Sequence, residues 1–274
     1  MIVKDIEVTL LAENTVEKRG FIAEHGLSFW IRYGENEYLF DTGQGHVLLN
    51  NLDKLNINLS EINSVILSHG HDDHCGGLKK LLEINPEVEV IAHEDAFLPK
   101  YKMSFGELVN IGANINKEEI NNFINVENKK MIIEDGLYIT GVIDVDKDSY
   151  INDKYIIKKD GKEMIDPFND DISLYMESDE GIVILLGCSH KGVVNIIEDI
   201  REKTGYKKIK AILGGMHLKH SSEDEITEIV NYLNKLDFDL LAPIHCTGYK
   251  AAMMMKERFG DKVKLASTAD SFSF

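Results

Sequence analysis

The chain has 274 residues, of which 43% are hydrophobic and 28% charged, and its formal net charge is −17 at pH 7. This length suits one large domain with a deep core or two small ones. The negative charge disfavours nucleic acid and anionic membrane surfaces as partners, because long-range repulsion opposes both. Three cysteines argue against a disulfide framework. No signal peptide or membrane-spanning segment is expected, so we predict a cytoplasmic protein.

The first third of the chain is predicted to alternate strands with turns and then with helices. Two runs rich in β-branched and aromatic residues are joined by a glycine-containing turn to a third short apolar run, which indicates a hairpin. Helical spacing of apolar residues follows, and the next apolar run is too short for a helix and predicts a buried strand. The predicted strands are 7–11, 27–33, 38–40, 65–67 and 88–92, and the predicted helices are 46–55 and a segment around 78–82.

The remaining chain is predicted to divide into an irregular and a regular part. From about residue 96 to 167, apolar periodicity gives way to Asn-, Gly- and Lys-rich stretches, so we predict a lid-like insertion within a single domain of residues 1–274. Regular structure then returns, with a capping box at 222–225 that opens a helix. Strands are predicted at 172–176, 182–186, 209–213 and 240–244, and helices at 193–200 and 222–233. Two such halves favour a layered α/β protein.

Four side chains that commonly bind metals follow the predicted strand 65–67. His69 and His71 are two residues apart, and alternate residues of an extended chain point to the same side, so both imidazoles can meet one metal ion. Asp73 and His74 come where the chain turns into a helix, with Asp73 as its expected cap, and are directed toward a second ion. Nitrogen and carboxylate ligands suit zinc, iron or manganese.

The run 68–77, Ser-His-Gly-His-Asp-Asp-His-Cys-Gly-Gly, resembles the signature of the metallo-β-lactamase superfamily. The resemblance extends over about residues 24–260, and further stretches look like the branch of 7,8-dihydropterin-6-yl-methyl-4-(β-D-ribofuranosyl)aminobenzene 5′-phosphate synthase-like proteins. These stretches are 24–28, 40–44, 166–171, 186–190, 214–218 and 243–248. The resemblance implies an α/β (α+β) fold, a four-layered αββα sandwich. It also implies two divalent ions, with His190 completing the first site and His245 the second.

One position departs from the superfamily pattern. Where many members have a bridging aspartate in a Gly-Asp pair, this chain has Gly187-Cys188. Three alternatives remain open: Cys188 is a ligand, Asp171 reaches in from the preceding segment, or solvent alone bridges the ions. We favour the solvent bridge and interpret Cys188 as a small buried residue that packs the strand end.

The leading hypothesis is a metallohydrolase that attacks a small, anionic phosphoester with a water activated by two ions, zinc before iron or manganese. Asp73 would ligate a metal and steer the nucleophile, and His217, at another strand end, would protonate the leaving group. Asp41 is expected to orient a metal-binding histidine. His25 is expected to border the site or to turn the chain.

Three alternatives remain. A pterin–aminobenzene ribotide transferase would need an aromatic pocket, for which Trp30, Tyr101 and Phe105 are available. Iron at the same ligands would permit oxygen chemistry, which the absence of room for a flavodoxin-like domain disfavours. A metal-bearing ligand sensor would bind without turnover. A homodimer is left open.

Overall fold

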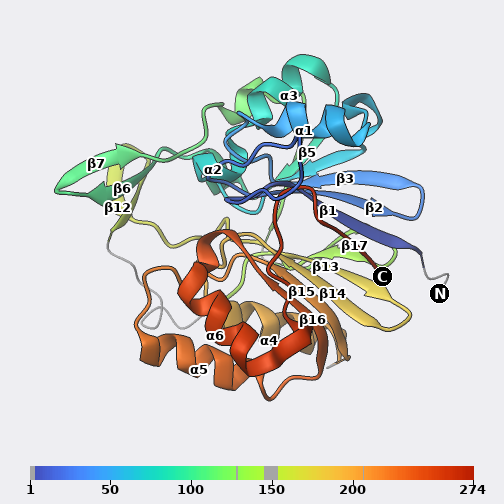
Figure 1. Cartoon of the computed structure of the whole chain (residues 1–274). Helices are drawn as coiled ribbons and strands as arrows, with labels where there is room; N and C mark the ends of the chain where they lie inside the picture. Colours follow the sequence, from blue (N-terminus) through green and yellow to red (C-terminus); the bar gives the residue numbers. More distant parts are fainter. Residues whose placement is uncertain (1–3, 128, 145–153, 206) are drawn as a thin grey trace.

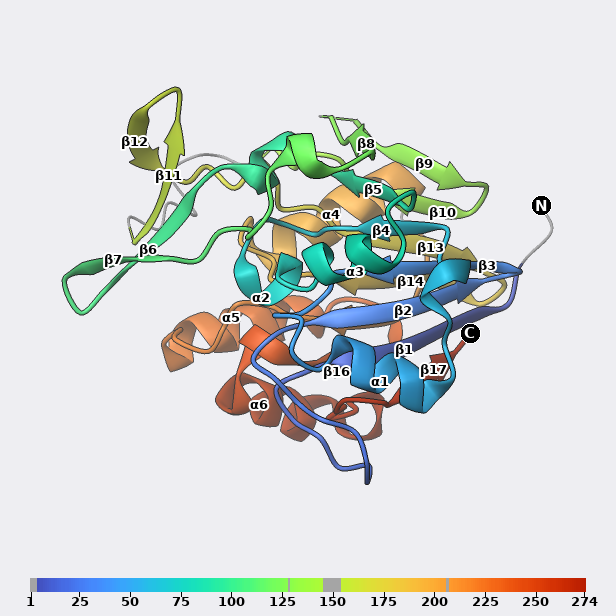
Figure 2. The same ribbon diagram turned by 90° about the horizontal axis from the view of Figure 1, so that it is seen from above.

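The structure, a computed structural model, describes residues 4–127, 129–144, 154–205 and 207–274. Two large sheets face each other, and helices cover the outer face of each (Figure 1). The predicted four-layered αββα sandwich is therefore confirmed. Both described ends of the chain lie at the same end of the molecule, opposite a small sheet that projects from the body (Figures 1 and 2).

The first large sheet has seven strands and is formed mainly by the N-terminal half of the chain. Neighbouring strands among the first four in spatial order run antiparallel, and the pairs from the fourth strand onward are parallel. In spatial order the strands are β17 (Ser271–Ser273), β1 (Ile6–Ala12), β2 (Ser28–Tyr33), β3 (Asn36–Phe40), β4 (Ser64–Ile66), β5 (Glu89–Ala92) and β8 (Asn122–Asn125).

The second large sheet has six strands, three of which run parallel at its C-terminal side. In spatial order they are β16 (Phe238–Pro243), β15 (Ile209–Gly214), β14 (Gly181–Leu186), β13 (Leu174–Ser178), β10 (Leu137–Ile139) and β9 (Met131–Glu134). The small projecting sheet contains β12 (Lys162–Ile165), β11 (Tyr155–Lys159), β6 (Lys100–Ser104) and β7 (Glu107–Asn110).

Helices α1 and α3 cover the seven-stranded sheet, and α4, α5 and α6 cover the six-stranded sheet (Figure 1). The α-helices are α1 (Leu48–Leu55), α2 (Asp72–Cys75), α3 (Leu78–Ile84), α4 (Val193–Thr204), α5 (Glu223–Leu233) and α6 (Tyr249–Phe259). The short 3-10 helices are η1 (Leu59–Glu61), η2 (Glu94–Phe97), η3 (Lys117–Glu119), η5 (His245–Thr247) and η6 (Gly260–Lys262). Within the described chain, no helix combines the length and the apolar character needed to cross a bilayer.

Strand β14 shows why the layers form. Val183 and Leu185 belong to the core between the two sheets, whereas Ile182, Ile184 and Leu186 belong to the core beneath α4, α5 and α6. A central strand that is covered on both faces must be apolar at every position, not only at alternate ones. Each fully buried side chain of this kind contributes about 1.5–3 kcal/mol. The continuous apolar run that predicted this strand thus follows from its place between two layers.

The predicted insertion at 96–167 needs a correction, because its described residues do not form one unit. Only β6, β7, β11 and β12 make the projecting sheet, while β8 extends the seven-stranded sheet and β9 and β10 extend the six-stranded one. Leu137 and Ile139 are fully buried between the two large sheets. These strands are only three or four residues long, and they join the core by pairing with the edges of the two large sheets.

The parallel strands determine where functional side chains gather. Strands β3 and β4 of one sheet, and β14, β15 and β16 of the other, end on the same side of the sandwich (Figure 1). Ligands of open α/β sheets bind outside such carboxyl ends. The segments that follow these five strands carry Asp41, His69, Cys188, His217 and His245.

Candidate metal centre

A first group of three buried imidazoles consists of His69, His71 and His190. Their nearest ring nitrogens all lie within 4.8 Å of one another, and Nε2 of His69 is 3.0 Å from Nδ1 of His71. Nε2 of His71 and Nε2 of His190 are buried, and neither has a hydrogen-bond partner among the described residues. An unpartnered buried polar atom costs free energy unless something binds it. A metal ion would satisfy both nitrogens.

Burial keeps these three imidazoles neutral, as metal ligation requires. Burial, followed by the neighbouring Lys100, lowers the pKa of His71 to about 3. Burial and the adjacent imidazoles hold the pKa of His69 and of His190 well below the usual range. The ring of Phe168 stacks on His190 at a centroid distance of 4.3 Å and an angle of 5°. The group is therefore uncharged and fixed in orientation.

A second group contains the other three predicted ligands, Asp73, His74 and His245. Nε2 of His74 is 3.1 Å from Nε2 of His245, which in turn is 3.4 Å from Oδ2 of Asp73. His25 reaches the same Asp73 oxygen at 3.4 Å, so it borders the site. The structure thus brings His69, His71 and His190 into one possible ligand group, and Asp73 and His245 into another with His25. His74 lies between the two, beside His69 and His245. Asn14, which the sequence did not indicate, accepts a hydrogen bond from His245 Nδ1 at 3.0 Å and leaves Nε2 directed at the centre.

Asp41 fixes His74 as expected. Oδ2 of Asp41 is 2.7 Å from Nδ1 of His74, and both side chains are fully buried. The backbone N–H and the hydroxyl of Ser68 donate to the two oxygens of Asp41, each at 2.7 Å. Burial lowers the pKa of His74, but the carboxylates of Asp41 and Asp73 outweigh it and raise the value to about 9. A metal ion at His74 would therefore displace a proton.

Asp73 does not cap the helix that follows it, contrary to the prediction. The N-cap position of α2 is His71, and Asp73 lies within the first turn. Burial raises the pKa of Asp73, but the imidazoles of His74 and His245 outweigh burial and hold it well below its usual range. The helix begins two residues earlier than expected. Its N-cap, His71, has extended backbone (φ −82°, ψ 145°), and the next residue is already helical. This earlier start leaves the Asp73 carboxylate free to face the cavity.

Of the three bridging alternatives, the structure brings Cys188 nearest to the imidazoles. Its sulfur is 3.0 Å from Nε2 of His74 and lies within 4.8 Å of a nitrogen of His69. Cys188 is buried, as predicted, but it packs against the proposed ligands and against Cys246. Asp171 accepts the backbone N–H of Lys191 at 2.6 Å, and within the described ranges no possible ligand group contains it.

A buried lysine that the sequence did not reveal braces the first group. Nζ of Lys100 donates to Asp166 at 2.7 Å and to Asp170 at 3.1 Å, and all three side chains are buried. The other oxygen of Asp170 accepts the backbone N–H of Gly70 at 2.8 Å. Gly70 stands between the first two histidine ligands, where any side chain would overlap the carbonyl of Ala96. The brace thus sets the backbone that directs both imidazoles.

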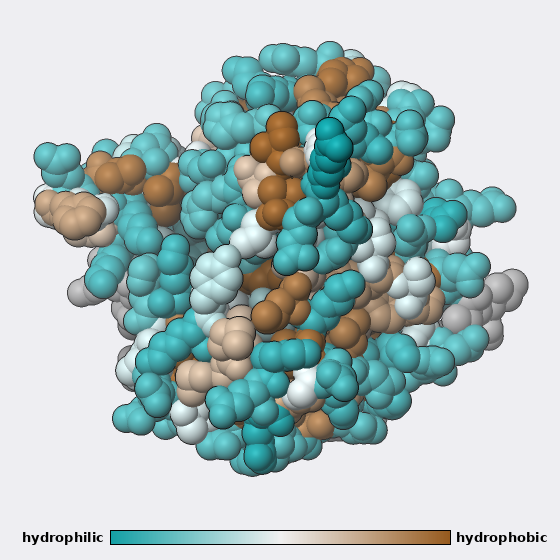
Figure 3. All heavy atoms as spheres, in the orientation of Figure 1, coloured by the Kyte–Doolittle hydropathy of each residue, from teal (hydrophilic) through white to brown (hydrophobic). Residues whose placement is uncertain are grey.

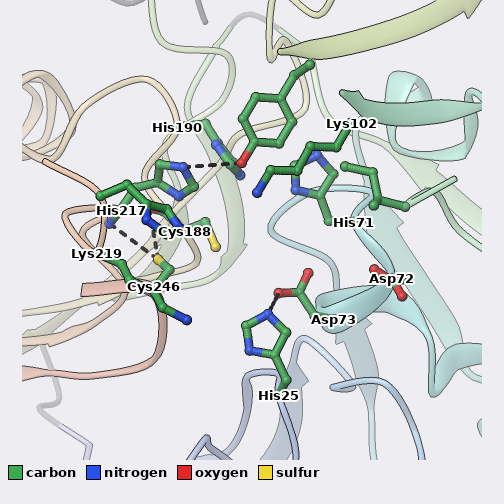
Figure 4. Close-up of a pocket in the computed structure, with 13 residues that line it drawn as sticks. His25, His71, Asp72, Asp73, Lys102, Cys188, His190, His217, Lys219 and Cys246 are labelled. Carbon is green, nitrogen blue, oxygen red and sulfur yellow. Dashed lines mark hydrogen bonds and ion pairs between the residues drawn. The ribbon is translucent and has the colours of Figure 1, made fainter. Parts of the chain in front are cut away.

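The two groups open on a cavity of about 260 Å³ (Figure 4). His217 lines it, and its Nε2 is 3.4 Å from the hydroxyl of Tyr155. Tyr155 is the aromatic side chain of the cavity, whereas Trp30 is buried elsewhere and donates to Glu37. The residues that line the cavity are His25, His71, Asp72, Asp73, Lys102, Ile111, Tyr155, Cys188, His190, His217, Lys219, His220 and Cys246.

Several residues of the centre have left-handed backbone. The φ angles are 64° at Asp41, 62° at Ser189, 54° at His217 and 53° at His245. This conformation costs an L-residue roughly 1–2 kcal/mol, and such residues concentrate at functional sites. The sharp bends directly after the strand ends are what turn these side chains back toward one another.

Known proteins resemble this chain along nearly its whole length. The metallo-beta-lactamase superfamily model matches residues 22–187. The chain is 33% identical over 259 residues to an uncharacterized protein of Methanocaldococcus jannaschii, covering 91% of this chain and 94% of the relative. It is 31% identical over 277 residues to the 7,8-dihydropterin-6-methyl-4-(beta-D-ribofuranosyl)-aminobenzene-5′-phosphate synthase of the same organism, covering 94% and 92%. A crystal structure described as a metal-dependent hydrolase of the beta-lactamase superfamily matches with a TM-score of 0.85 at 30% identity, over 97% of this chain and 98% of that one.

Proposed function

Because the chain belongs to the metallo-beta-lactamase superfamily, we propose that it is a metal-dependent hydrolase that cleaves a small phosphoester. The observation that carries the proposal is the pair of adjacent ligand groups that opens on one cavity, with two imidazole nitrogens buried and unpartnered. Buried imidazoles beside a carboxylate are the donor set of zinc, with iron and manganese as alternatives.

His69, His71 and His190 would hold the first of two divalent ions, and Asp73, His74 and His245 the second. When bound, the ions supply Lewis-acid stabilisation of the phosphoryl oxygens and lower the pKa of a water molecule.

The chain's own residues position the substrate and move the protons. Asp73 faces the cavity with one carboxylate oxygen 3.4 Å from Nε2 of His25, so its carboxylate can orient the attacking water (Figure 4). His217 lines the opposite side beside Tyr155, where it can give a proton to the leaving oxygen. Tyr155 would orient the His217 ring through the contact at its Nε2.

The test loads the purified protein with zinc, manganese or iron and measures hydrolysis of phosphodiesters, phosphomonoesters, thioesters and lactones. We expect metal-dependent turnover of a phosphoester. His71→Ala should abolish activity and metal loading of the first site, because it removes one of the three imidazoles proposed to hold that ion. His46→Ala changes an exposed histidine and should leave both intact. A His71→Ala protein that keeps its full metal content and activity would refute the assignment.

A second candidate function is transfer rather than hydrolysis. The 31% identity to the synthase covers 94% of this chain and supports this alternative. The same cavity would then join a pterin methyl group to an aminobenzene ribotide. Incubation with a pterin diphosphate and an aminobenzoate acceptor, followed by product analysis, separates the two functions. A coupled product supports transfer, and free phosphate from simple esters supports hydrolysis.

A further inference from the structure

Two lysines at the mouth of the cavity have no part in the chemistry proposed above. Lys102 comes from β6 of the projecting sheet, and Lys219 comes from the segment after β15. Figure 4 shows them on different sides of the cavity, with the amine of Lys102 directed inward and the amine of Lys219 on the side of His25. Lys102 is half-buried and Lys219 exposed, whereas the imidazoles of the proposed ligands are buried. The two positive charges therefore lie at the entrance of the cavity. We call this entrance the rim and the six proposed metal ligands the floor.

In the part of the chain that the structure describes, no ion pair neutralises either amine. Among the described residues, no carboxylate lies within ion-pair distance of Lys102 or Lys219, whereas Lys158 and Lys159 of the same sheet each contact one. Nζ of Lys102 lies 5.2 Å from the centre of the Tyr155 ring, a cation–π contact that holds the amine over the cavity. In a chain with a net charge of −17, two such amines at one cavity mouth offer an anion a binding place.

The charges of both lysines converge on the same space. Burial lowers the pKa of His220, and Lys102 and Lys219 lower it further, so both amines act on this cavity-lining ring. The acidic groups of the cavity are on the other wall, in α2. Asp73 there is engaged by His25 and by the metal-binding groups. The rim beside His220 is thus the positive side of the cavity even without metal.

We propose that Lys102 and Lys219 form an anion subsite that binds a second, non-reacting phosphate of the substrate. The inference rests on the proposed function, because the reacting ester is assigned to the metal-binding floor. It narrows the substrate class to small phosphoesters that carry a further terminal phosphate group. A phosphate dianion accepts charge-assisted hydrogen bonds from two ammonium groups, and each such bond is stronger than one between neutral groups.

The test measures binding without turnover. Metal-loaded protein is titrated calorimetrically with a series of α,ω-alkane diphosphonates, from ethane to hexane, and with the matching alkyl monophosphonates. Carbon–phosphorus bonds resist hydrolysis, so only binding is observed. We expect at least one diphosphonate to bind about tenfold more tightly than its monophosphonate, since one additional charge-assisted contact is worth about that factor. Lys102→Gln and Lys219→Gln should each reduce this ratio, and the double variant should abolish it.

The control is Lys158→Gln, which removes the same charge from an exposed position of the same sheet. It should leave the ratio unchanged, and all variants should retain the metal content of the parent. Three results would overturn the subsite. The double variant could keep the parent's preference for the diphosphonate, the parent could show no such preference, or Lys158→Gln could reduce the preference as much as the lysine variants do. A protein that hydrolyses phosphoesters but shows one of these results contradicts the subsite alone. A lysine-dependent ratio without any hydrolysis contradicts the proposed hydrolase alone.

Discussion

The floor of the metal centre and the projecting sheet differ in how firmly they are held. His69 and His74 are fully buried, and each has neighbours that fix its ring. In the projecting sheet, Met103, Phe105 and Leu108 are exposed by 41%, 106% and 41%, and apolar surface gathers there (Figure 3). A metal site needs ligands held within fractions of an ångström, whereas a substrate-facing rim tolerates thinner packing. The difference indicates that precision is concentrated at the floor.

Lys100 joins these two regions. It starts β6 of the projecting sheet, yet its amine is buried between Asp166 and Asp170, and Asp170 holds the backbone at Gly70. Burial lowers the pKa of Lys100, but the two carboxylates outweigh burial and raise it, so the lysine is charged. A substitution of Lys100 therefore tests whether the projecting sheet stabilises the metal centre.

Lys100→Met should have the largest effect on stability. Removing one partner of a buried ion pair leaves uncompensated charge and costs about 3–5 kcal/mol. Chemical denaturation should show this loss, and metal affinity should fall because Gly70 is no longer held. Lys158→Met on the same sheet breaks only an exposed pair and should cost less than about 1 kcal/mol. Equal losses in the two variants would show that the brace does not support the floor.

Asp41→Asn tests the floor by itself. The amide would place a donor against the donors of Ser68 or His74, and loss of such support for a ligand typically costs about 10–100-fold in metal affinity or activity. Competition with a chelator measures the affinity. Asp53→Asn, at an exposed position of α1, serves as the control. An unchanged affinity would mean that Asp41 does not orient His74 toward a metal.

Asp171→Asn tests how burial beside the metal centre affects the pH dependence of stability. Burial raises the pKa of Asp171 from 3.8 to about 7. Between these values the folded protein binds the proton and the unfolded chain does not, so the free energy of unfolding falls as pH rises from about 4 to 7. The variant lacks this loss, and its stability relative to the parent should grow by about 4 kcal/mol between pH 4 and 8.

The measurement uses chelator-treated protein, because a bound metal would change the field at Asp171. Asp179→Asn, at an exposed turn, should show no such pH dependence. A constant difference between parent and Asp171→Asn across the pH range would show that the carboxyl is charged throughout.

Phe105→Asn should have the smallest effect. Phe105 has a φ of 49° and an exposed side chain, and asparagine adopts this conformation readily. Substitutions at such surface positions usually change the free energy of unfolding by less than about 0.5 kcal/mol. Denaturation and metal content should match the parent. A clear loss of metal would show that the tip of the β6–β7 hairpin affects the metal ligands, although the two regions are packed differently.

Local pattern predicted much of the fold, because many elements are recognisable from neighbours in sequence. The strand 182–186 and the helix from 193 repeat apolar residues with the period of their structure, and β14 and α4 lie there. His69, His71 and His74 were recognisable together because they are close in sequence. Asp41 was assigned its role through the resemblance and its place at a strand end.

Residues that depend on distant partners could not be predicted. Lys100 lies in the stretch predicted to be an irregular insertion, and only the fold brings it to Asp166 and Asp170. Tyr155 reaches the cavity because β11 pairs with β6, more than fifty positions earlier in the chain. For Cys188 the sequence leaves a ligand role open and favours packing of a strand end, since no local signal shows that its sulfur faces His74.

The left-handed residues of the centre have a consequence for engineering. Glycine at His217 or His245 would relieve roughly 1–2 kcal/mol of backbone strain while deleting a functional imidazole. Glycine at Ser189 would relieve similar strain but would leave every proposed ligand in place. A library sorted for heat resistance alone would therefore enrich inactive clones at the first two codons, so each round of such sorting needs a parallel screen for metal retention.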